Sequence, residues 1–222
     1  MIVLIGDIIN SRRLHDRAKV QERFHFALDQ VNNKCAGQLV SIFTITHGDE
    51  FQGALKQGIG LLGIIDGISL ALLPIKLRFG IGIGEVTTKI DPTNSYTADG
   101  PAFWKAREAI DYVHDHNDYR KSNIHLCSQY PDNTVNLINQ ILKLTAHQVS
   151  GWRKSQFEVL EAILEEGISD PNLIPHKKIA EKLGISPSSL TRRLESSGIK
   201  RYLYAYRDAE IAIEKINSHL TE

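Results

Sequence analysis

The acidic side chains best suited to chemistry stand at two places in the N-terminal half of the chain. Asp7 ends a short apolar segment, and Asp49 and Glu50 follow a glycine in a turn between two further apolar segments. Carboxylate oxygens are hard ligands that bind Mg²⁺ or Mn²⁺ together with phosphate oxygens. If the fold brings the two places together, we expect Asp7 and Asp49 to bind a divalent metal ion.

Ser11 and Arg12, just after Asp7, have a hydroxyl and a basic group that can contact the phosphates of a nucleotide; the other interpretation is that they simply begin a solvated helix. The alternative is structural at both acidic places: an aspartate that caps the turn after a strand, and a hairpin loop built from turn-forming residues.

A second set of candidate residues lies in the last third of the chain. Gly184 can adopt the positive φ of a tight turn between two helices, and Ser186 followed by Pro187 suits the start of the second helix. The pattern predicts a helix-turn-helix whose second helix offers donors to phosphates and base edges. The predicted DNA-binding residues are Lys177, Lys178, Ser186, Ser188, Ser189, Thr191, Arg192 and Arg193.

The charge of the chain favours DNA only locally. Lys+Arg and Asp+Glu number 26 each, so the whole chain is not a polycation. Between Lys177 and Arg207, two acidic residues stand among eight basic ones: Lys177, Lys178, Lys182, Arg192, Arg193, Lys200, Arg201 and Arg207. This excess favours a nucleic-acid surface, and the alternative is a helical hairpin for packing or dimer contact only.

Length and composition indicate an ordinary globular protein. The 222 residues favour two domains, which we place at 1–148 and 149–222, and an apolar content of 42% excludes disorder. Cys35 and Cys127 have no metal-binding or disulfide spacing. The apolar start is too short for a signal peptide, and Asp66 interrupts the longest apolar run, so we expect a cytoplasmic protein without a membrane partner.

Hydrophobic periodicity predicts the elements that must position these side chains. Strands are predicted at 2–5, 39–46, 51–55, 75–86 and 123–127, and helices at 16–33, 58–73, 101–113, 133–147, 153–166, 176–183, 187–197 and 200–220. The β-α-β-β-α-β order at the start is ferredoxin-like. This part should form an antiparallel sheet with helices on one face, and the later elements extend it. The predicted fold class is therefore α+β, with a ferredoxin-like antiparallel sheet and an all-α helix-turn-helix domain after it. Gly80, Gly82 and Gly84 share a strand face that another element or a ligand can approach closely.

Four motifs of the first part resemble the nucleotidyl cyclase and diguanylate cyclase superfamily. They are Ile5-Gly6-Asp7-Ile8-Ile9, His47-Gly48-Asp49-Glu50-Phe51, Gly80-Ile81-Gly82-Ile83-Gly84-Glu85 and Ala102-Phe103-Trp104-Lys105-Ala106-Arg107. The resemblance implies that Asp7 and Asp49 hold catalytic metal ions, that Glu50 follows in the signature turn, and that Arg107 contacts a phosphate. With these motifs, the predicted nucleotide-binding residues are Ser11, Arg12, Glu50, Lys105 and Arg107.

The chain departs from that superfamily at three positions. His47 replaces the first glycine of the diguanylate cyclase signature, Trp104 stands where a nucleotidyl cyclase has its catalytic asparagine, and Glu108 stands where it has an arginine. These departures favour nucleotide binding without turnover.

Two further resemblances concern the last third and the whole chain. Residues 157–186 resemble the helix-turn-helix of response-regulator and sigma-factor type, which implies a second helix that reads sequence. The whole chain looks most like the SatD family of bacterial proteins, on the segments IGDIINSR, THGDEFQGAL and DGPAFWKAREAI.

Together these patterns predict a DNA-binding regulatory protein. Its cyclase-like domain would bind a nucleoside triphosphate or a cyclic nucleotide with Mg²⁺ or Mn²⁺, and a homodimer would bind paired half-sites. The first alternative is a Mg-dependent nucleotidyl cyclase or nucleotidyltransferase enzyme. The second is a domain with vestigial acidic sites that serves dimer or partner contact only.

Overall fold

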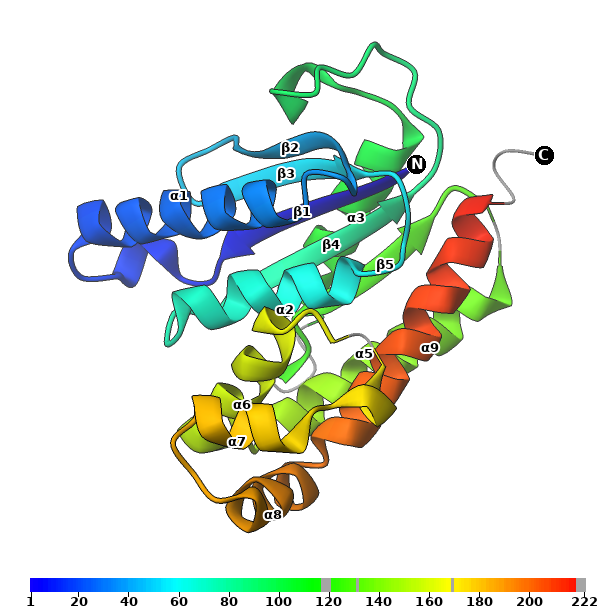
Figure 1. Ribbon diagram of the computed structural model, residues 1–222. Helices are drawn as coiled ribbons and strands as arrows, with labels where there is room; N and C mark the ends of the chain where they lie inside the picture. The colour runs from blue at the N-terminus through cyan, green and yellow to red at the C-terminus, as the bar shows by residue number, and fades with distance from the viewer. Residues whose placement is uncertain (117–120, 131, 169, 219–222) are drawn as a thin grey trace.

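The computed structural model describes residues 1–116, 121–130, 132–168 and 170–218, which form an α+β fold around one sheet (Figure 1). The strands are β1 (Ile2–Ile8), β2 (Leu39–Ile45), β3 (Glu50–Leu55), β4 (Leu77–Ile83) and β5 (Ile124–Ser128). The helices are α1 (Arg17–Lys34), α2 (Leu61–Leu72), α3 (Pro101–Asp115), α5 (Asn133–Val149), α6 (Lys154–Glu165), α7 (His176–Lys182), α8 (Pro187–Ser197) and α9 (Ile199–Ser218), with 3-10 turns η1 (Ser11–Arg13), η2 (Ser95–Thr97) and η3 (Pro171–Leu173). All the predicted strands and helices are present, and the predicted end of the last helix at 220 lies outside the described residues.

The five strands form a mixed sheet in the order β2-β3-β1-β4-β5. β1 pairs antiparallel with β3 and with β4, and β2 pairs antiparallel with β3. β5 pairs parallel with β4, which corrects the expectation of an antiparallel sheet. The reason is that α3 crosses between β4 and β5, and a helical crossover returns the chain as a parallel strand.

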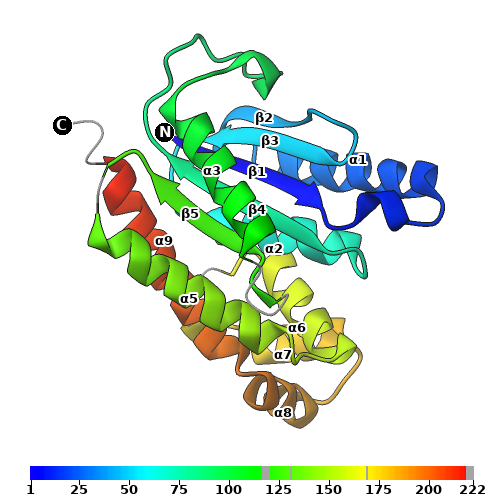
Figure 2. The same ribbon diagram turned by 180° about the vertical axis from the view of Figure 1, so that it is seen from behind.

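Different helices cover the two faces of the sheet. α1 and α2, the helices of the β-α-β-β-α-β part, lie on one face in Figure 1, and α3, which follows that part, lies on the other face in Figure 2. The glycines of β4 explain how α3 packs so closely. A Cβ atom on Gly80 would lie 2.2 Å from the Ala106 carbonyl oxygen, and one on Gly82 would lie 2.1 Å from that of Ala102. A helix, rather than a ligand, therefore uses the space above these glycines.

One continuous cluster of buried apolar side chains joins the sheet to the C-terminal helices. It includes Leu4 and Phe51 of the sheet, Ile65 of α2, Val159 of α6 and Ile213 of α9. A smaller cluster, which includes Val3, lies on the face covered by α3. The residues before and after position 148 therefore share a core.

Buried polar contacts fix α9 against α2. The Tyr202 hydroxyl lies 2.7 and 2.8 Å from the two carboxylate oxygens of Asp66, and a Glu210 carboxylate oxygen accepts the Leu62 N–H at 2.8 Å. Burial raises the pKa of Asp66 to about 7, against the opposing effect of the Tyr202 hydrogen bond. These contacts hold α9 against α2, and α2 in turn packs on the sheet.

None of the described helices combines the length and the apolar character needed to cross a membrane.

Candidate functional site

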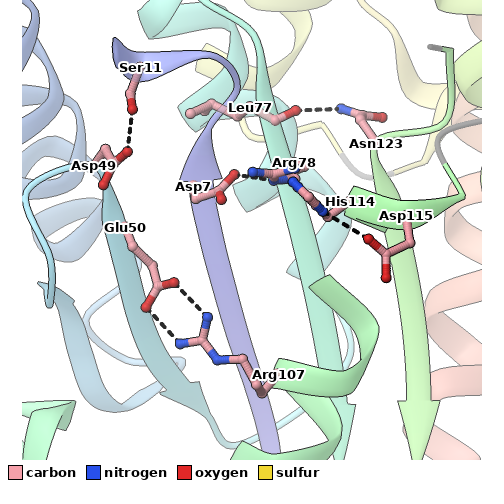
Figure 3. A network of polar contacts seen from close by, with 10 residues as sticks. All are labelled: Asp7, Ser11, Asp49, Glu50, Leu77, Arg78, Arg107, His114, Asp115 and Asn123. Atoms are coloured by element: carbon pink, nitrogen blue, oxygen red, sulfur yellow. Dashed lines mark hydrogen bonds and ion pairs between the residues drawn. The ribbon is translucent and has the colours of Figure 1, made fainter. Parts of the chain in front are cut away.

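Three charged side chains stand in a row across the centre of the sheet. The strand register pairs Asp7 of β1 with Glu50 of β3 on one side and with Arg78 of β4 on the other. Directly opposite residues point to the same face, and here it is the face that α3 covers, like that of Val3. The fold therefore brings together the two acidic places that are distant in sequence (Figure 3).

Asp7 is held by an arginine that the sequence analysis did not select. Arg78 Nε donates to Asp7 Oδ1 at 2.5 Å, and both side chains are largely covered. Burial raises the pKa of Asp7 and the neighbouring carboxylates Asp49 and Glu50 add to this rise, whereas Arg78 opposes it. The sequence signal for Arg78 was present, because strand alternation places it on the same face as Gly80 and Gly82.

Glu50 forms a bidentate ion pair with the helix above it. The two terminal guanidinium nitrogens of Arg107, on α3, donate to Glu50 Oε2 at 2.6 Å and to Oε1 at 2.7 Å, and the Thr46 hydroxyl donates to Oε1 at 2.9 Å. The side chain of Glu50 is 13% exposed and that of Arg107 is 43% exposed. Burial acts to raise the pKa of Glu50, but the hydrogen bonds and charge of Arg107 lower it below its usual value.

Asp49 completes the group from the hairpin between β2 and β3. Its carboxylate accepts a short hydrogen bond from the Ser11 hydroxyl of η1, and its backbone oxygen accepts the Ile8 N–H at 3.0 Å. Gly48 precedes it with a φ of 63°, a conformation that favours glycine. The hairpin is therefore tied to the end of β1. We refer to Asp7, Ser11, Asp49, Glu50, Arg78 and Arg107 as the charged cluster.

Two of the predicted nucleotide-binding residues lie outside the charged cluster. Lys105 pairs with Glu108 at 2.7 Å, and the charges of both act on the thiol of Cys127 in β5, on the other side of α3 from Glu50. Lys105 and Arg107 are two positions apart on α3, so their side chains diverge by about 200° and point to opposite sides of the helix, and only one of them can reach β3. Arg12 is exposed on η1, next to Ser11.

The charged cluster has the groups for metal and phosphate binding, but they are engaged with one another. Each of its three carboxylates accepts a hydrogen bond from a side chain of the protein. Within the described part of the chain there is no group of three or more His, Cys, Asp or Glu side chains arranged to hold a metal ion. A cation at Asp7 and Asp49 would take the place of Arg78 and of the Ser11 hydroxyl.

The second candidate site is the α7–α8 corner, residues 176–197. Gly184 turns the chain with a φ of 63°, and the Ser186 hydroxyl caps α8 by accepting the Ser189 N–H at 3.2 Å. Leu190 and Leu194 are buried on the inner face of α8. Figure 1 shows α8 at the end of the molecule that is farthest from the sheet, so its outer face is open to a partner.

The predicted DNA-binding residues divide between the outer and inner sides of this corner. Lys177, Ser188 and Arg192 are exposed. The hydroxyls of Ser186, Ser188 and Ser189 lie within hydrogen-bond distance of one another, and the Thr191 hydroxyl donates to the Pro187 carbonyl at 3.1 Å.

Arg193 instead faces α6, because its position on α8 follows that of the buried Leu190 by almost one turn. It lies 3.4 Å from the Ser155 carbonyl oxygen and 3.6 Å from the Glu158 carboxylate. This placement corrects the expectation that Arg193 lies on the exposed face of α8.

Acidic residues at the C-terminal end of α6, Glu165 and the Glu166 that follows the helix, reduce the basic character of the corner. Lys178 pairs with Glu166 at 2.5 Å, and Lys182 pairs with Glu165 at 2.7 Å. The count of eight basic residues against two acidic ones omitted these carboxylates, because they precede the counted segment in sequence. The local basic excess is smaller than the sequence suggested.

The fold and these two sites define an α+β protein with a charged cluster on its sheet and a helical corner, α7–α8, whose outer face is exposed. The model of the SatD family matches residues 1–214, and the chain belongs to the SatD family. Neither a curated protein nor a solved structure matches the chain.

Proposed function

We propose that the protein is a DNA-binding regulator that contacts DNA through the α7–α8 corner, acting as a helix-turn-helix. The observation that carries this proposal is the exposed, capped start of α8, where Ser188 and Arg192 face outward at the far end of the molecule. A recognition helix inserts its N-terminal residues into the major groove, and these side chains suit phosphates and base edges there.

We further propose that the charged cluster binds a nucleotide together with Mg²⁺ or Mn²⁺. The order β2-β3-β1-β4 of the first four strands supports a ferredoxin-like sheet of the nucleotidyl cyclase type. Asp7 and Asp49 offer the oxygen ligands that such ions prefer, and Arg107 offers a bidentate donor for phosphate. The bound ion would screen the charge between the protein's carboxylates and the phosphates.

Binding without turnover is favoured over catalysis by the contacts of the carboxylates. Arg78 and Arg107 neutralise Asp7 and Glu50 without any ligand, so the cluster is stable as a closed set of ion pairs. A vestigial site that serves dimer or partner contact only would have the same contacts. A nucleotidyl cyclase or nucleotidyltransferase would differ from both by forming product from a nucleoside triphosphate.

A homodimer completes the proposal, because helix-turn-helix proteins generally bind two half-sites one turn of DNA apart. Sedimentation or light scattering of the full chain, with and without DNA, measures this directly. A monomer in both conditions would contradict it.

DNA binding is tested by selection from a random pool of duplexes. We expect the full-length protein to enrich a sequence motif, and Ser188→Ala/Arg192→Ala to lose the enrichment while remaining folded. Lys19→Ala is the matched control, since it removes an exposed basic residue from α1 and should leave the motif unchanged. Absence of a motif with the wild type would contradict the DNA-binding proposal.

Nucleotide binding is tested by thermal unfolding with nucleoside triphosphates and cyclic nucleotides in the presence of Mg²⁺. A ligand at one hundred times its dissociation constant adds about 2.7 kcal/mol to the free energy of unfolding. We expect one ligand to stabilise the wild type and the Asp29→Asn control on α1, and not Asp7→Asn/Asp49→Asn. Stabilisation of that double variant would exclude the charged cluster as the site, and product release in the same samples would indicate the enzyme.

A further inference from the structure

We propose that the base of the nucleotide stacks on an aromatic surface beside the charged cluster, formed by His47, Tyr96 and Trp104. We refer to these three residues as the aromatic rim. This inference rests on the proposed nucleotide function. The charged cluster was proposed to bind the metal ion and the phosphates, and the inference adds a binding surface for the base.

Two large rings of the aromatic rim are more exposed than their size would lead one to expect. Tyr96 is 57% exposed and Trp104 is 58% exposed, although folding normally buries most of the surface of such side chains. Exposed aromatic rings that lie next to a charged site are typical of ligand-binding surfaces.

The rings are arranged around the pair of Glu50 and Arg107. His47 Nδ1 lies 3.9 Å from Glu50 Oε1, and its ring centroid lies 6.3 Å from that of Tyr96. Trp104 precedes Arg107 by almost one turn of α3, which places both on the same side of that helix. His47 of the hairpin therefore lies beside Glu50 and next to Tyr96 of η2, and Trp104 lies on the side of α3 that carries Arg107.

Hydrogen bonds hold the segments that carry these rings, while their faces remain open. Ser95, which precedes Tyr96, is fully buried; its hydroxyl donates to the Gln52 carbonyl at 2.8 Å, and Gln52 Nε2 donates to the Ser95 carbonyl at 2.6 Å. The Trp104 indole N–H donates to Asp99 Oδ1 at 2.7 Å. Rings that are positioned before a ligand arrives lose little conformational freedom on binding it.

The expected ligand is a planar base attached to phosphates. The base would stack on an aromatic ring, since every nucleobase has a π-face that accepts such contact without a specific hydrogen bond. Arg107 would turn from Glu50 to a phosphate, with its planar guanidinium matched to two phosphate oxygens. The aromatic rim thus accounts for base binding and the charged cluster for phosphate binding.

The test compares three probes on the full chain in the presence of Mg²⁺: ATP, GTP and inorganic triphosphate. Equilibrium binding is measured for the wild type, for Tyr96→Ser/Trp104→Ser, and for the control Phe26→Ser, which removes an exposed ring from α1 on the opposite face of the sheet. We expect at least one nucleoside triphosphate to bind the wild type and the control more tightly than inorganic triphosphate does. The rim variant should lose roughly tenfold or more in affinity for that nucleotide, with its affinity for inorganic triphosphate unchanged.

The contrary outcomes separate this inference from the function on which it rests. If the rim variant binds the nucleotide as the wild type does, or if inorganic triphosphate binds as tightly as both nucleotides, the base does not stack on the rim. If none of the three probes binds the wild type, the base-stacking inference is wrong for these ligands. The proposed nucleotide function is wrong as well only if the cyclic nucleotides of the thermal-unfolding test also fail to stabilise the wild type. Circular dichroism of each variant verifies that it is folded.

Discussion

The charged cluster and the α7–α8 corner both pair opposite charges, but over different distances along the chain. In the charged cluster, Arg78 and Asp7 are 71 residues apart, and Arg107 and Glu50 are 57 apart. At the corner, Lys182 and Glu166 are only 16 apart. A charge count along the segment 177–207 therefore misleads at the corner, because the carboxylates that pair with its lysines, Glu165 and Glu166, lie outside that segment.

The two regions also differ in how much their ion pairs are covered. The side chains of Asp7 and Arg78 are 20% and 19% exposed, whereas Lys178 and Glu165 in the pairs at the corner are 65% and 53% exposed. Water and salt screen an exposed pair, so it contributes little to stability. Breaking a covered pair leaves a charge without a partner, which costs more. We therefore expect substitutions in the charged cluster to have larger effects on stability than matched substitutions at the corner.

The largest difference in stability is expected between two glycine substitutions, one in β4, the strand that carries Arg78, and one in the α7–α8 corner. Gly82→Ala places a Cβ atom against the backbone of α3 and should lower the free energy of unfolding by about 3 kcal/mol. Gly184→Ala meets open space and only strains a positive φ, so it should cost about 1 kcal/mol. Urea unfolding measures both. Equal losses would show that α3 packs less tightly on the sheet than the structure indicates.

A second prediction concerns Asp66, at the junction between the regions. Its pKa is raised to about 7 from 3.8 in the folded protein, so its stabilising effect is full at low pH and is lost as the pH rises toward 7. Groups that face it are Tyr202, Tyr206 and Glu210 of α9. Asp66→Asn should remove a decline on the order of 2 kcal/mol between pH 5 and pH 8. A wild type and variant with parallel stability profiles in urea would contradict this.

A third prediction compares an ion pair of each region directly. Arg107→Met should cost about 1 kcal/mol at pH 7, and Lys182→Met should cost less, because Glu50 is 13% exposed and accepts two hydrogen bonds from Arg107, whereas Glu165, which pairs with Lys182, is 53% exposed. The pKa of Glu50 is lowered in the folded protein, so the stabilisation by Arg107 is present above the usual value of 4.5 and is lost as the pH falls below it. Urea unfolding at pH 7 and pH 3.5 should show the Arg107→Met difference shrinking at the lower pH. A larger loss from Lys182→Met would reverse the comparison.

The smallest expected effect is at the corner. Glu166→Gln removes an acceptor of both Lys178 and Lys182 and should leave stability nearly unchanged. Because the freed lysines can then contact phosphates, DNA affinity should rise about twofold and depend more steeply on salt. Fluorescence anisotropy at several salt concentrations measures this, with Glu22→Gln on α1 as the control. A lower DNA affinity of Glu166→Gln than of the wild type would indicate that DNA does not contact Lys178 and Lys182.

The order of strands and helices was predictable because hydrophobic periodicity and turn residues are local signals. Strands 39–46 and 51–55 and helix 187–197 agree closely with β2, β3 and α8. The faces of the sheet were less predictable, since the position of α3 depends on the close approach of Ala102 and Ala106 to the β4 glycines. That packing becomes evident only when the register of the whole sheet is known.

The candidate site residues likewise divide into those with a local sequence signal and those whose contacts depend on the whole fold. Asp7, Asp49 and Glu50 were identified from their turns, and Arg107 from its motif, because each has a local signature. Arg78 was missed because its partner is set by strand pairing across 71 residues. The inward position of Arg193 was missed because the contact with α6 depends on the angle between two helices.

For a DNA-binding regulator with a nucleotide site, we propose that nucleotide bound at the charged cluster alters DNA binding at the α7–α8 corner, because one continuous core joins the sheet to the C-terminal helices. The direct measurement is the affinity of the full-length protein for its selected duplex, with and without the stabilising nucleotide and Mg²⁺. We predict a change of at least about fivefold, and an equal change in nucleotide affinity when DNA is present, since such coupling is reciprocal. The same DNA affinity in both conditions, with nucleotide shown to be bound, would contradict the claim.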